Sequence, residues 1–248
     1  AGCWAAGTAT IMILGDQCTR ACRFCAVGTR TAPPPPDADE PARVAAALKR
    51  LGLRYAVITS VTRDDLPDGG AAHFAAVVRA CRAASPGTRV ELLIPDLGGD
   101  LAALDVIVAA APDVVGHNLE TVRRLSRETR DPRTDYDRSL GVFAHLAAQG
   151  VEAKSALLLG LGETGDEVAE ALADLRRVGV RHVALGQYLA PSKEHIPVRE
   201  YVTPETFDAW ADRCRELGFA SVASGPLVRS SYMAAEVVGP TLADAPGA

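Results

Sequence analysis

Three cysteines stand close together near the start of the chain, at Cys18, Cys22 and Cys25 in the segment GDQCTRACRFC. A structural zinc site is normally closed by four ligands, and the first histidine after these cysteines is His73. Three is also an odd number for disulfide pairing. A four-iron cluster can instead be held by three thiolates, which leaves one iron open to an external ligand. The spacing favours such an iron–sulfur site, with a zinc site as the alternative.

The elements that must position these cysteines form a repeating pattern. Six apolar runs are continuous rather than alternating, as in strands buried on both faces, and helical patterns of fitting length separate them. Strands that alternate with helices predict a parallel sheet covered by helices. The predicted strands are residues 8–15, 54–61, 90–95, 113–120, 154–160 and 182–190.

The predicted helices are supported by their ends and by their apolar stripes. Thr164 and Glu167 are spaced as a capping box, with apolar residues following at helical spacing. Cys81 and Cys214 each fall within the apolar stripe of a predicted helix. We therefore expect these two cysteines to be buried core thiols rather than ligands.

Polar residues occupy the carboxyl ends of the predicted strands, and the cysteine segment follows the first strand directly. Thr59 and Ser60 end the second strand, and Asn118 and Glu120 end the fourth. In a barrel of parallel strands this end carries the active site, so we expect a cofactor pocket there. The charged run RDDLPDGG, residues 63–70, is expected to be a solvated turn.

The composition is that of one globular domain, predicted to span residues 1–248. Hydrophobic residues make up 48% of the chain, and the formal net charge is -5. This acidic balance argues against nucleic acid as a main partner. The longest apolar stretches fall short of the roughly 18 residues of a membrane-spanning helix, so no membrane partner is expected. Clustered cysteines at short spacing suit a reducing cytoplasm.

The cysteine motif and several further segments resemble a known family. The spacing C-x3-C-x2-C, with Phe24 immediately before the last cysteine, resembles the radical S-adenosylmethionine (SAM) superfamily. Within it, GTATIMILGDQCTRACRFC, VELLIPD, HNLETV, QYLAPSKEH and GPLVRSSY are similar, in this order, to lipoyl synthases, from Gly2 to about Met233. The resemblance implies an α/β fold, a partial (β/α)6 TIM-like barrel of the radical SAM type.

The resemblance also implies a reaction and its partners. The cluster on Cys18, Cys22 and Cys25 would cleave SAM to give a 5'-deoxyadenosyl radical. The radical would act on an octanoyl chain carried on a lysine of a lipoyl carrier domain, and a second 4Fe-4S cluster would supply two sulfur atoms to carbons 6 and 8. The carrier would be a 2-oxoacid dehydrogenase acyltransferase or a glycine cleavage H protein. A ferredoxin or flavodoxin would be the reducing partner of this sulfurtransferase.

Ligands of the second cluster are implied by the same resemblance. In the family that cluster is held by a C-x4-C-x5-C pattern and by a serine of the RSSY segment. Cys3 matches the last cysteine of this pattern, and Ser230 matches the serine. Arg229, beside Ser230, would influence the release of sulfur. The first two cysteines of the pattern are not in this sequence, so we expect a barrel with a short amino-terminal remnant, an RSSY tail and an incomplete second cluster.

Contacts with SAM are predicted from position at the strand ends alone. Asn118 and Glu120 are the candidates for the ribose, and Lys154 with Thr59 or Ser60 for the polar end of SAM. Two alternatives remain at this point. One is a radical SAM enzyme that does not insert sulfur, and the other is a non-catalytic barrel with an iron–sulfur cluster or zinc.

Overall fold

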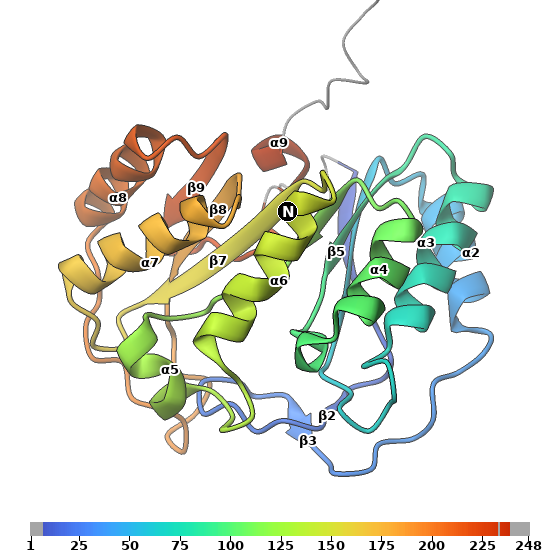
Figure 1. Ribbon diagram of the computed structural model, residues 1–248, viewed down its shortest axis with the longest axis horizontal. Helices are drawn as coiled ribbons and strands as arrows, with labels where there is room; N and C mark the ends of the chain where they lie inside the picture. Colours follow the sequence, from blue (N-terminus) through green and yellow to red (C-terminus); the bar gives the residue numbers. More distant parts are fainter. Residues whose placement is uncertain (1–6, 233, 239–248) are drawn as a thin grey trace, which may run out of the picture.

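Seven parallel strands form one curved sheet in the computed structural model, which describes residues 7–232 and 234–238. The strands are β1 (Thr8–Ile13), β4 (Tyr55–Ser60), β5 (Arg89–Leu93), β6 (Val114–Gly116), β7 (Ala153–Leu159), β8 (His182–Gln187) and β9 (Ser221–Gly225). They lie in the sheet in this same order, and each pairs in parallel with the next. The short pair β2 (Gln17–Cys18) and β3 (Gly28–Thr29) lies beyond their carboxyl ends (Figure 1).

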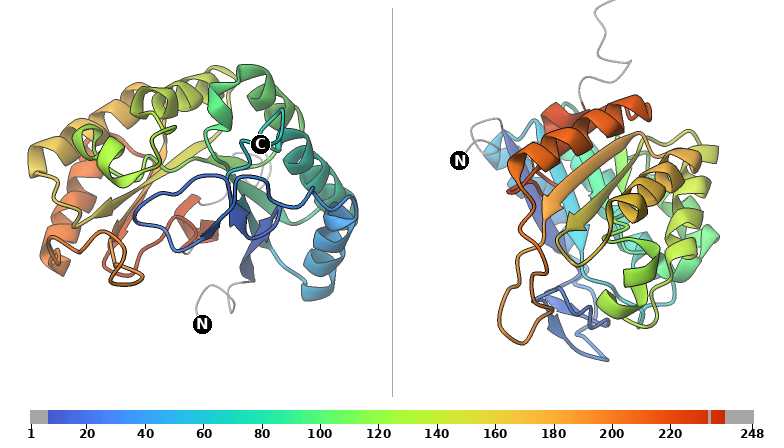
Figure 2. Two further views of the ribbon diagram at one scale, coloured as in Figure 1. Left: turned by 90° about the horizontal axis from the view of Figure 1, so that it is seen from below. Right: turned by 90° about the vertical axis from the view of Figure 1, so that its left-hand side faces the viewer.

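Helices cover the outer face of this sheet. Seen from below in Figure 2, the sheet is an open arch with the helices on its convex side and the cysteine segment across its mouth. The helical elements are α2 (Glu40–Leu51), α3 (Ala71–Ala84), the 3-10 turn η1 (Leu97–Gly99), α4 (Leu101–Ala109), α5 (Arg123–Thr129), α6 (Tyr136–Ala148), α7 (Gly165–Arg177), α8 (Pro204–Glu216) and α9 (Ala234–Val238).

The core lies between the sheet and the helices. β8 is buried at all of its positions, as expected for a strand covered on both faces. One apolar cluster joins β1, β4 and β5 to α2, α3 and α4, and a second joins β7 and β8 to α7 and α8. Cys81 and Cys214 are fully buried in these clusters, as predicted. Burial raises the pKa of Cys81 to about 11 and that of Cys214 to about 12, so both thiols stay protonated.

The capping box predicted at the start of α7 is confirmed. The Thr164 hydroxyl accepts a hydrogen bond from the Glu167 amide at 3.3 Å, and the Glu167 carboxylate accepts one from the Thr164 amide at 2.8 Å. These two bonds satisfy amides that the first turn of a helix leaves without partners. The turn that follows β7 is thereby held in place at the carboxyl end of the sheet.

The predicted partial barrel is confirmed, with one strand more than expected. β9 follows α8 and pairs with β8. Its sequence, SVASG, lacks an apolar run, and all five of its positions are only partly buried, so the strand was not predicted. In the described part of the chain β1 and β9 are the two edges of the sheet, so the barrel is open between them. None of the helices described is long and apolar enough to cross a bilayer.

The amino-terminal ends of the strands form a closed floor to the barrel. The Lys154 ammonium donates to both oxygens of the Glu91 carboxylate, at 2.9 and 3.2 Å, and the Tyr55 hydroxyl donates to the same carboxylate at 2.6 Å. All three side chains are buried. Ala234 of α9 packs against Tyr55 and Val57, on the face of β4 opposite to the one that the outer helices cover.

Candidate active site

A cavity of about 290 Å³ lies at the carboxyl ends of β1, β4, β5 and β6, where the polar strand ends predicted a pocket. Cys18, Cys22 and Cys25 all line it. The fold therefore brings the three thiols to one cavity, with Phe24 between the last two. The other lining side chains come from the strand ends and from the segment before α6, among them Met12, Thr59, Ser60, Leu93, Ile94, His117, Asn118, Glu120 and Arg130.

Three thiols that line one cavity are the donor set of a four-iron cluster with one open iron. Within residues 7–232 and 234–238, no three His, Cys, Asp or Glu side chains converge closely enough to hold one metal ion. The zinc alternative is therefore not supported there. A cluster is instead bound by thiolates at separate corners, as three thiols around one cavity allow. Partial desolvation by the surrounding cavity raises the pKa of Cys22 and of Cys25, so ligation to iron is what would deprotonate them.

Main-chain amides point at all three sulfur atoms, and the Cys25 sulfur is bound by its near neighbour Val27. The amides of Arg20 and Thr62 each donate to Cys18 Sγ at 3.4 Å, and the amide of Asp131 donates to Cys22 Sγ at the same distance. Such bonds stabilise negative charge on sulfur and help to set the reduction potential of a cluster. The amides of Arg20, Thr62 and Asp131 come from three separate segments, so the positions of these two sulfur atoms depend on the tertiary fold.

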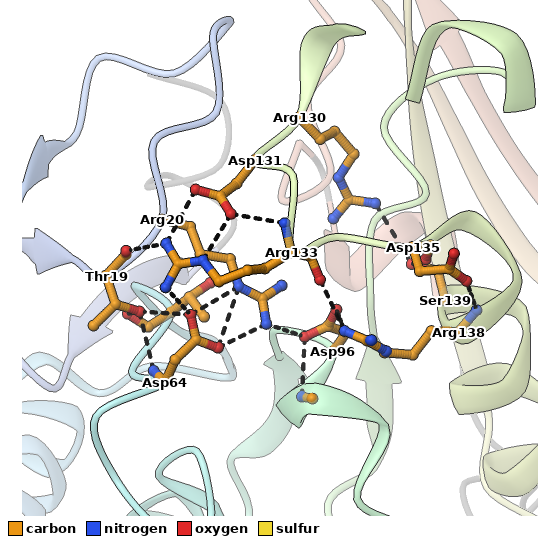
Figure 3. Close-up of polar contacts among 12 residues, drawn as sticks. Thr19, Arg20, Asp64, Asp96, Arg130, Asp131, Arg133, Asp135, Arg138 and Ser139 are labelled. Carbon is orange, nitrogen blue, oxygen red and sulfur yellow. Dashed lines mark hydrogen bonds and ion pairs between the residues drawn. The ribbon is translucent and has the colours of Figure 1, made fainter. Parts of the chain in front are cut away.

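A network of ion pairs holds the first half of the cysteine segment (Figure 3). The Arg20 guanidinium, with a side chain only 5% exposed, lies 2.7 Å from both the Asp64 and the Asp96 carboxylates. The Thr19 hydroxyl donates to Asp64 at 2.9 Å. Arg20 follows the first cysteine by two residues, whereas Asp64 and Asp96 follow β4 and β5. The network therefore ties the cysteine segment to the ends of two strands.

The same network reaches the segment between α5 and α6 through Asp131. The Asp131 carboxylate accepts from the amide of Ala21 at 2.9 Å and from Arg133 at 2.9 Å, and Arg133 also lies 3.3 Å from Asp64. The hydrogen bond from Arg133 holds the pKa of Asp131 well below its usual range, so the carboxylate stays ionised. Asp131 thus fixes the turn between Thr19 and Cys22, in addition to the contacts that Asp64 makes with Thr19 and Arg20.

The expectation of a solvated turn holds for most of residues 63–70, where Asp64, Asp65 and Pro67 are exposed, but it is wrong for Arg63. Arg63 is only 1% exposed and donates to the main-chain carbonyls of Leu14 and Pro34, at 3.1 and 2.9 Å. Asp65 accepts two hydrogen bonds of 2.8 Å from the same guanidinium. Leu14 and Pro34 lie before and after the cysteines, so Arg63 fixes both ends of the segment. Its position directly after a predicted strand was the signal that could have indicated this role.

Asn118 and Glu120 face the cavity together. The Asn118 amide nitrogen donates to the Glu120 carboxylate at 3.1 Å, and burial raises the pKa of that carboxyl. Glu120 has φ of 71°, an uncommon conformation for a residue other than glycine. Main-chain hydrogen bonds to Ala156 and Leu158 of β7 hold it there, at 3.0 and 2.8 Å. Thr59 and Ser60 also line the cavity, as predicted.

Arg130, which was not predicted, lines this cavity as a cation, and Lys154 does not. Lys154 is the second residue of β7, and its ammonium is bound to Glu91 in the barrel floor, so its prediction as a SAM contact is wrong. Arg130 is 9% exposed and donates to the Leu119 carbonyl at 3.2 Å. Its Nε is buried without a partner among the described residues. A polar group left in this state is a candidate to bind a ligand.

A second cavity of about 230 Å³ adjoins the first. Ser230 and Arg229 line it, and Phe24, Asn118 and Glu120 line both cavities. The floor of this second cavity is made by small residues of β7 and β8. Gly186 is required there, because a Cβ atom would lie 2.2 Å from the Val228 carbonyl oxygen. Cys3 lies outside the described residues.

Comparisons with known proteins agree with this architecture. Residues 12–175 match the Radical SAM superfamily model. The chain is 56% identical over 239 residues to a lipoyl synthase from Anaeromyxobacter dehalogenans, covering 96% of this chain and 81% of that protein. It is 54% identical to a lipoyl synthase from Thermus thermophilus, covering 95% and 73%. The same identity is found with lipoyl synthase 1, chloroplastic, from Zea mays, of which the chain spans 64% while 93% of this chain is covered.

Solved structures show the same fold at low sequence identity. The hydrogenase maturase HydG from Carboxydothermus hydrogenoformans superimposes with a TM-score of 0.69 at 15% identity, covering 87% of this chain and 52% of that one. Methylornithine synthase (PylB) does so with a TM-score of 0.64 at 14% identity, covering 86% and 63%. At these identities the likeness concerns the fold alone.

Proposed function

Because this chain belongs to the lipoyl synthase family of the radical SAM superfamily, we propose that it inserts two sulfur atoms into a protein-bound octanoyl chain, at carbons 6 and 8. The observation that carries this proposal is the pair of adjoining cavities. One holds the three thiols and the other holds Ser230, and Phe24, Asn118 and Glu120 form the boundary between them. A substrate at that boundary is within reach of both cavities.

The radical SAM family implies one 4Fe-4S cluster and SAM, and Cys18, Cys22 and Cys25 are the residues that would hold the cluster. With SAM bound, the cluster supplies a 5'-deoxyadenosyl radical, which can abstract hydrogen from an unactivated carbon. The chain itself supplies position. Arg20, Asp64 and Asp131 hold the cysteine segment rigid, and main-chain amides direct hydrogen bonds at the sulfur atoms.

The polar end of SAM is assigned to the residues that the structure places beside the thiols. Arg130 offers a guanidinium to the carboxylate of SAM, in the role first expected of Lys154. The hydroxyls of Thr59 and Ser60 donate to the carbonyls of Leu93 and Val61, at 3.2 and 2.8 Å. Their remaining lone pairs can therefore accept from the ammonium of SAM.

Asn118 and Glu120 are assigned to the ribose of SAM. Their side chains already share one hydrogen bond, so the pair presents a fixed set of donors and acceptors to two neighbouring hydroxyls. Phe24 lies beside them and contributes an apolar wall to both cavities. Exclusion of water by such a wall protects a reactive radical from side reactions.

The second cavity is assigned to the sulfur-donating cluster. Ser230 would be an oxygen ligand, Cys3 a sulfur ligand, and Arg229 the neighbouring cation that influences sulfur release. The three-cysteine pattern of the family has only its last member, Cys3, within this sequence. Iron and sulfide analysis of the reconstituted chain tests this assignment. About four irons per chain are expected for one cubane, and about eight would contradict an incomplete second cluster.

The proposed function is tested by anaerobic reconstitution with iron and sulfide, followed by dithionite, SAM and a peptide with an octanoylated lysine. From the chain as given, mass spectrometry should detect 5'-deoxyadenosine and methionine, and Cys22→Ala should abolish both. A chain extended at its amino end by the other two cysteines of the pattern should in addition yield a sulfur-containing octanoyl chain. Deoxyadenosine without sulfur from the extended chain would favour the alternative of a radical SAM enzyme that does not insert sulfur. No deoxyadenosine from a cluster-loaded chain would favour a non-catalytic barrel.

The physiological partners follow from this reaction as proposals. The acyl substrate requires a lipoyl carrier domain, either of a 2-oxoacid dehydrogenase acyltransferase or of a glycine cleavage H protein. The electron requires a small reducing protein such as a ferredoxin or flavodoxin. Replacing dithionite by each reduced protein, and the peptide by each carrier domain, tests these partners separately. Product must then form at a rate at least equal to that with the artificial component.

A further inference from the structure

We infer that His195 is a positioning residue for Cys25, acting through a loop that crosses over the cysteine segment. The loop, residues 188–203, joins β8 to α8. Figure 2 shows it beside the cysteine segment at the mouth of the barrel. The inference rests on the proposed function in one respect, namely that Cys25 ligates an iron of the SAM-cleaving cluster.

The imidazole of His195 contacts the main chain of Cys25 directly. His195 Nε2 lies 3.1 Å from the Cys25 carbonyl oxygen, and Nδ1 lies 2.8 Å from the Ser192 hydroxyl. A carbonyl oxygen can only accept, so Nε2 carries the proton and donates it. Ser192 contacts the other ring nitrogen, and its hydroxyl also donates to the Glu194 carboxylate, so the ring is held in orientation from both of its nitrogens.

The loop is anchored on both sides of His195. The amide of Ile196 donates to the Arg23 carbonyl at 3.2 Å, so two successive residues of the loop bind the cysteine segment. The buried Tyr188 hydroxyl donates to the Ile196 carbonyl at 2.7 Å. Further along, the Gln187 side chain binds the main chain of Glu200 at 3.0 Å. These hydrogen bonds hold the loop in place, so the loop can support the imidazole against Cys25.

Cys25 needs such support more than the other two cysteines do. Cys18 and Cys22 lie in the half of the segment that the ion pairs of Arg20 and Asp131 hold, and each sulfur accepts an amide hydrogen bond from another segment. Cys25 is exposed, and so are the five residues that follow it. Its hydrogen bonds within the segment are only local, from its amide to the Cys22 carbonyl at 3.1 Å and from the Val27 main chain to its sulfur. The bond from His195 reaches it from a distant part of the chain.

Loss of this bond should therefore loosen one corner of the cluster without affecting the fold. Residues that orient a ligand from outside the first coordination shell typically change metal affinity by about 10- to 100-fold when they are lost. We expect His195→Ala to release iron to a chelator about tenfold faster than the unaltered protein. We also expect a shifted midpoint potential, because the position of the Cys25 sulfur relative to its surroundings changes.

The test uses the reconstituted full chain in four forms: unaltered, His195→Ala, His195→Gln and His145→Ala. Glutamine retains a side-chain N–H, so His195→Gln should restore iron retention and potential most of the way. His145 lies on α6 and pairs with Asp105, far along the chain from the cysteines, and its loss should change neither reading. Iron release is followed by chelator absorbance, and the potential by an electron paramagnetic resonance titration without SAM.

Several outcomes would overturn the inference. One is a His195→Ala protein that retains iron and keeps its potential like the unaltered chain. Another is a His195→Gln protein as impaired as the alanine variant, which would mean that packing and not hydrogen bonding matters. Should His195→Ala fail to fold by circular dichroism, Ser192→Ala, which frees the ring but leaves the imidazole, must give an intermediate release rate. An unaltered chain that binds no cluster would instead overturn the proposed function together with this inference.

Discussion

Two buried cations face the interior of the barrel, one at each end, and they differ in how fully they are paired. Lys154 in the floor binds both oxygens of Glu91, which Tyr55 also contacts. Arg130 at the mouth binds the Leu119 carbonyl, while its Nε has no partner among the described residues. A fully paired buried charge serves the fold, whereas an incompletely paired one at a cavity serves a ligand. The distinction separates the structural end of the barrel from its reactive end.

Breaking the ion pair between Glu91 and Lys154 in the barrel floor should have the largest effect, a loss of stability. Glu91→Gln leaves the Lys154 ammonium buried without a countercharge, and we expect the free energy of unfolding to fall by about 3–5 kcal/mol. Chemical denaturation of the cluster-free protein measures this. The double variant Glu91→Leu with Lys154→Met removes both charges and should recover most of the loss. A double variant as unstable as Glu91→Gln would show that the site depends on charge itself.

His117 extends the comparison to a mouth residue that the protein keeps neutral. Its ring lies 3.0 Å from both the Ile94 carbonyl and the Ser139 hydroxyl, and burial lowers its pKa to about 4. The imidazole of His117 takes up a proton near pH 6.5 in the unfolded chain but only near pH 4 in the folded chain. The free energy of unfolding therefore falls as the pH drops from 6.5 toward 4. We expect His117 to contribute a slope of about 1 kcal/mol per pH unit in that window.

Denaturation at pH 7, 6 and 5 measures this slope, with His117→Gln as the comparison. The variant should lose less stability than the unaltered protein between pH 7 and pH 5, because glutamine does not titrate. If the free energy of unfolding falls equally with pH in the two proteins, groups other than His117 cause the acid sensitivity.

Substitution of Arg130 should weaken the binding of SAM rather than lower the stability of the fold. We expect Arg130→Met to raise the Kd for SAM about tenfold, which corresponds to about 1.4 kcal/mol, through loss of the cation at the carboxylate. Calorimetric titration of the cluster-loaded protein with SAM measures this. Arg127→Met is the matched control, since Arg127 is exposed on α5 three residues earlier. An unchanged Kd in Arg130→Met would place the carboxylate of SAM elsewhere.

Asn118 should show the smallest effect of the series. Asn118→Ala removes one neutral hydrogen bond to the ribose, so we expect the Kd for SAM to rise by about fivefold, or about 1 kcal/mol. Iron content and the absorption spectrum of the cluster should not change, because the hydrogen bond described for the Asn118 side chain goes to Glu120 and not to the cysteine segment. If SAM binding is unchanged while iron content falls, Asn118 belongs to the support of the cluster and not to the ribose site.

The sequence predicted those parts of the molecule whose signals are local. Strands appear as apolar runs, the α7 cap as a spaced Thr164 and Glu167, and the thiols of the cavity as a spaced motif. Lys154 opened its predicted strand, and a residue at the start of a parallel strand lies at the end opposite the site. That reasoning alone could have corrected the assignment. β9 gave no such signal, because its small residues are only partly buried.

The ion-pair network could not be predicted, since its members are far apart in the chain. Arg20 and Asp64 are separated by 44 residues, and Ala21 and Asp131 by 110. Each of these charged residues, seen alone in the sequence, is typical of a solvated surface. Only the folded chain shows that Asp64 and Asp131 converge on residues 19–21, and that Arg63 binds Leu14 and Pro34 on either side of the cysteines.

The strand order of the sheet has a consequence for biosynthesis. Because each strand pairs with the one made just before it, the sheet can grow in the direction of translation, beginning with β1. The supports of the cysteine segment are made after it, first Asp64, then Asp131, and last His195. The three thiols therefore leave the ribosome before the residues that secure them, and the last of these supports is available only after translation has passed the β8–α8 loop.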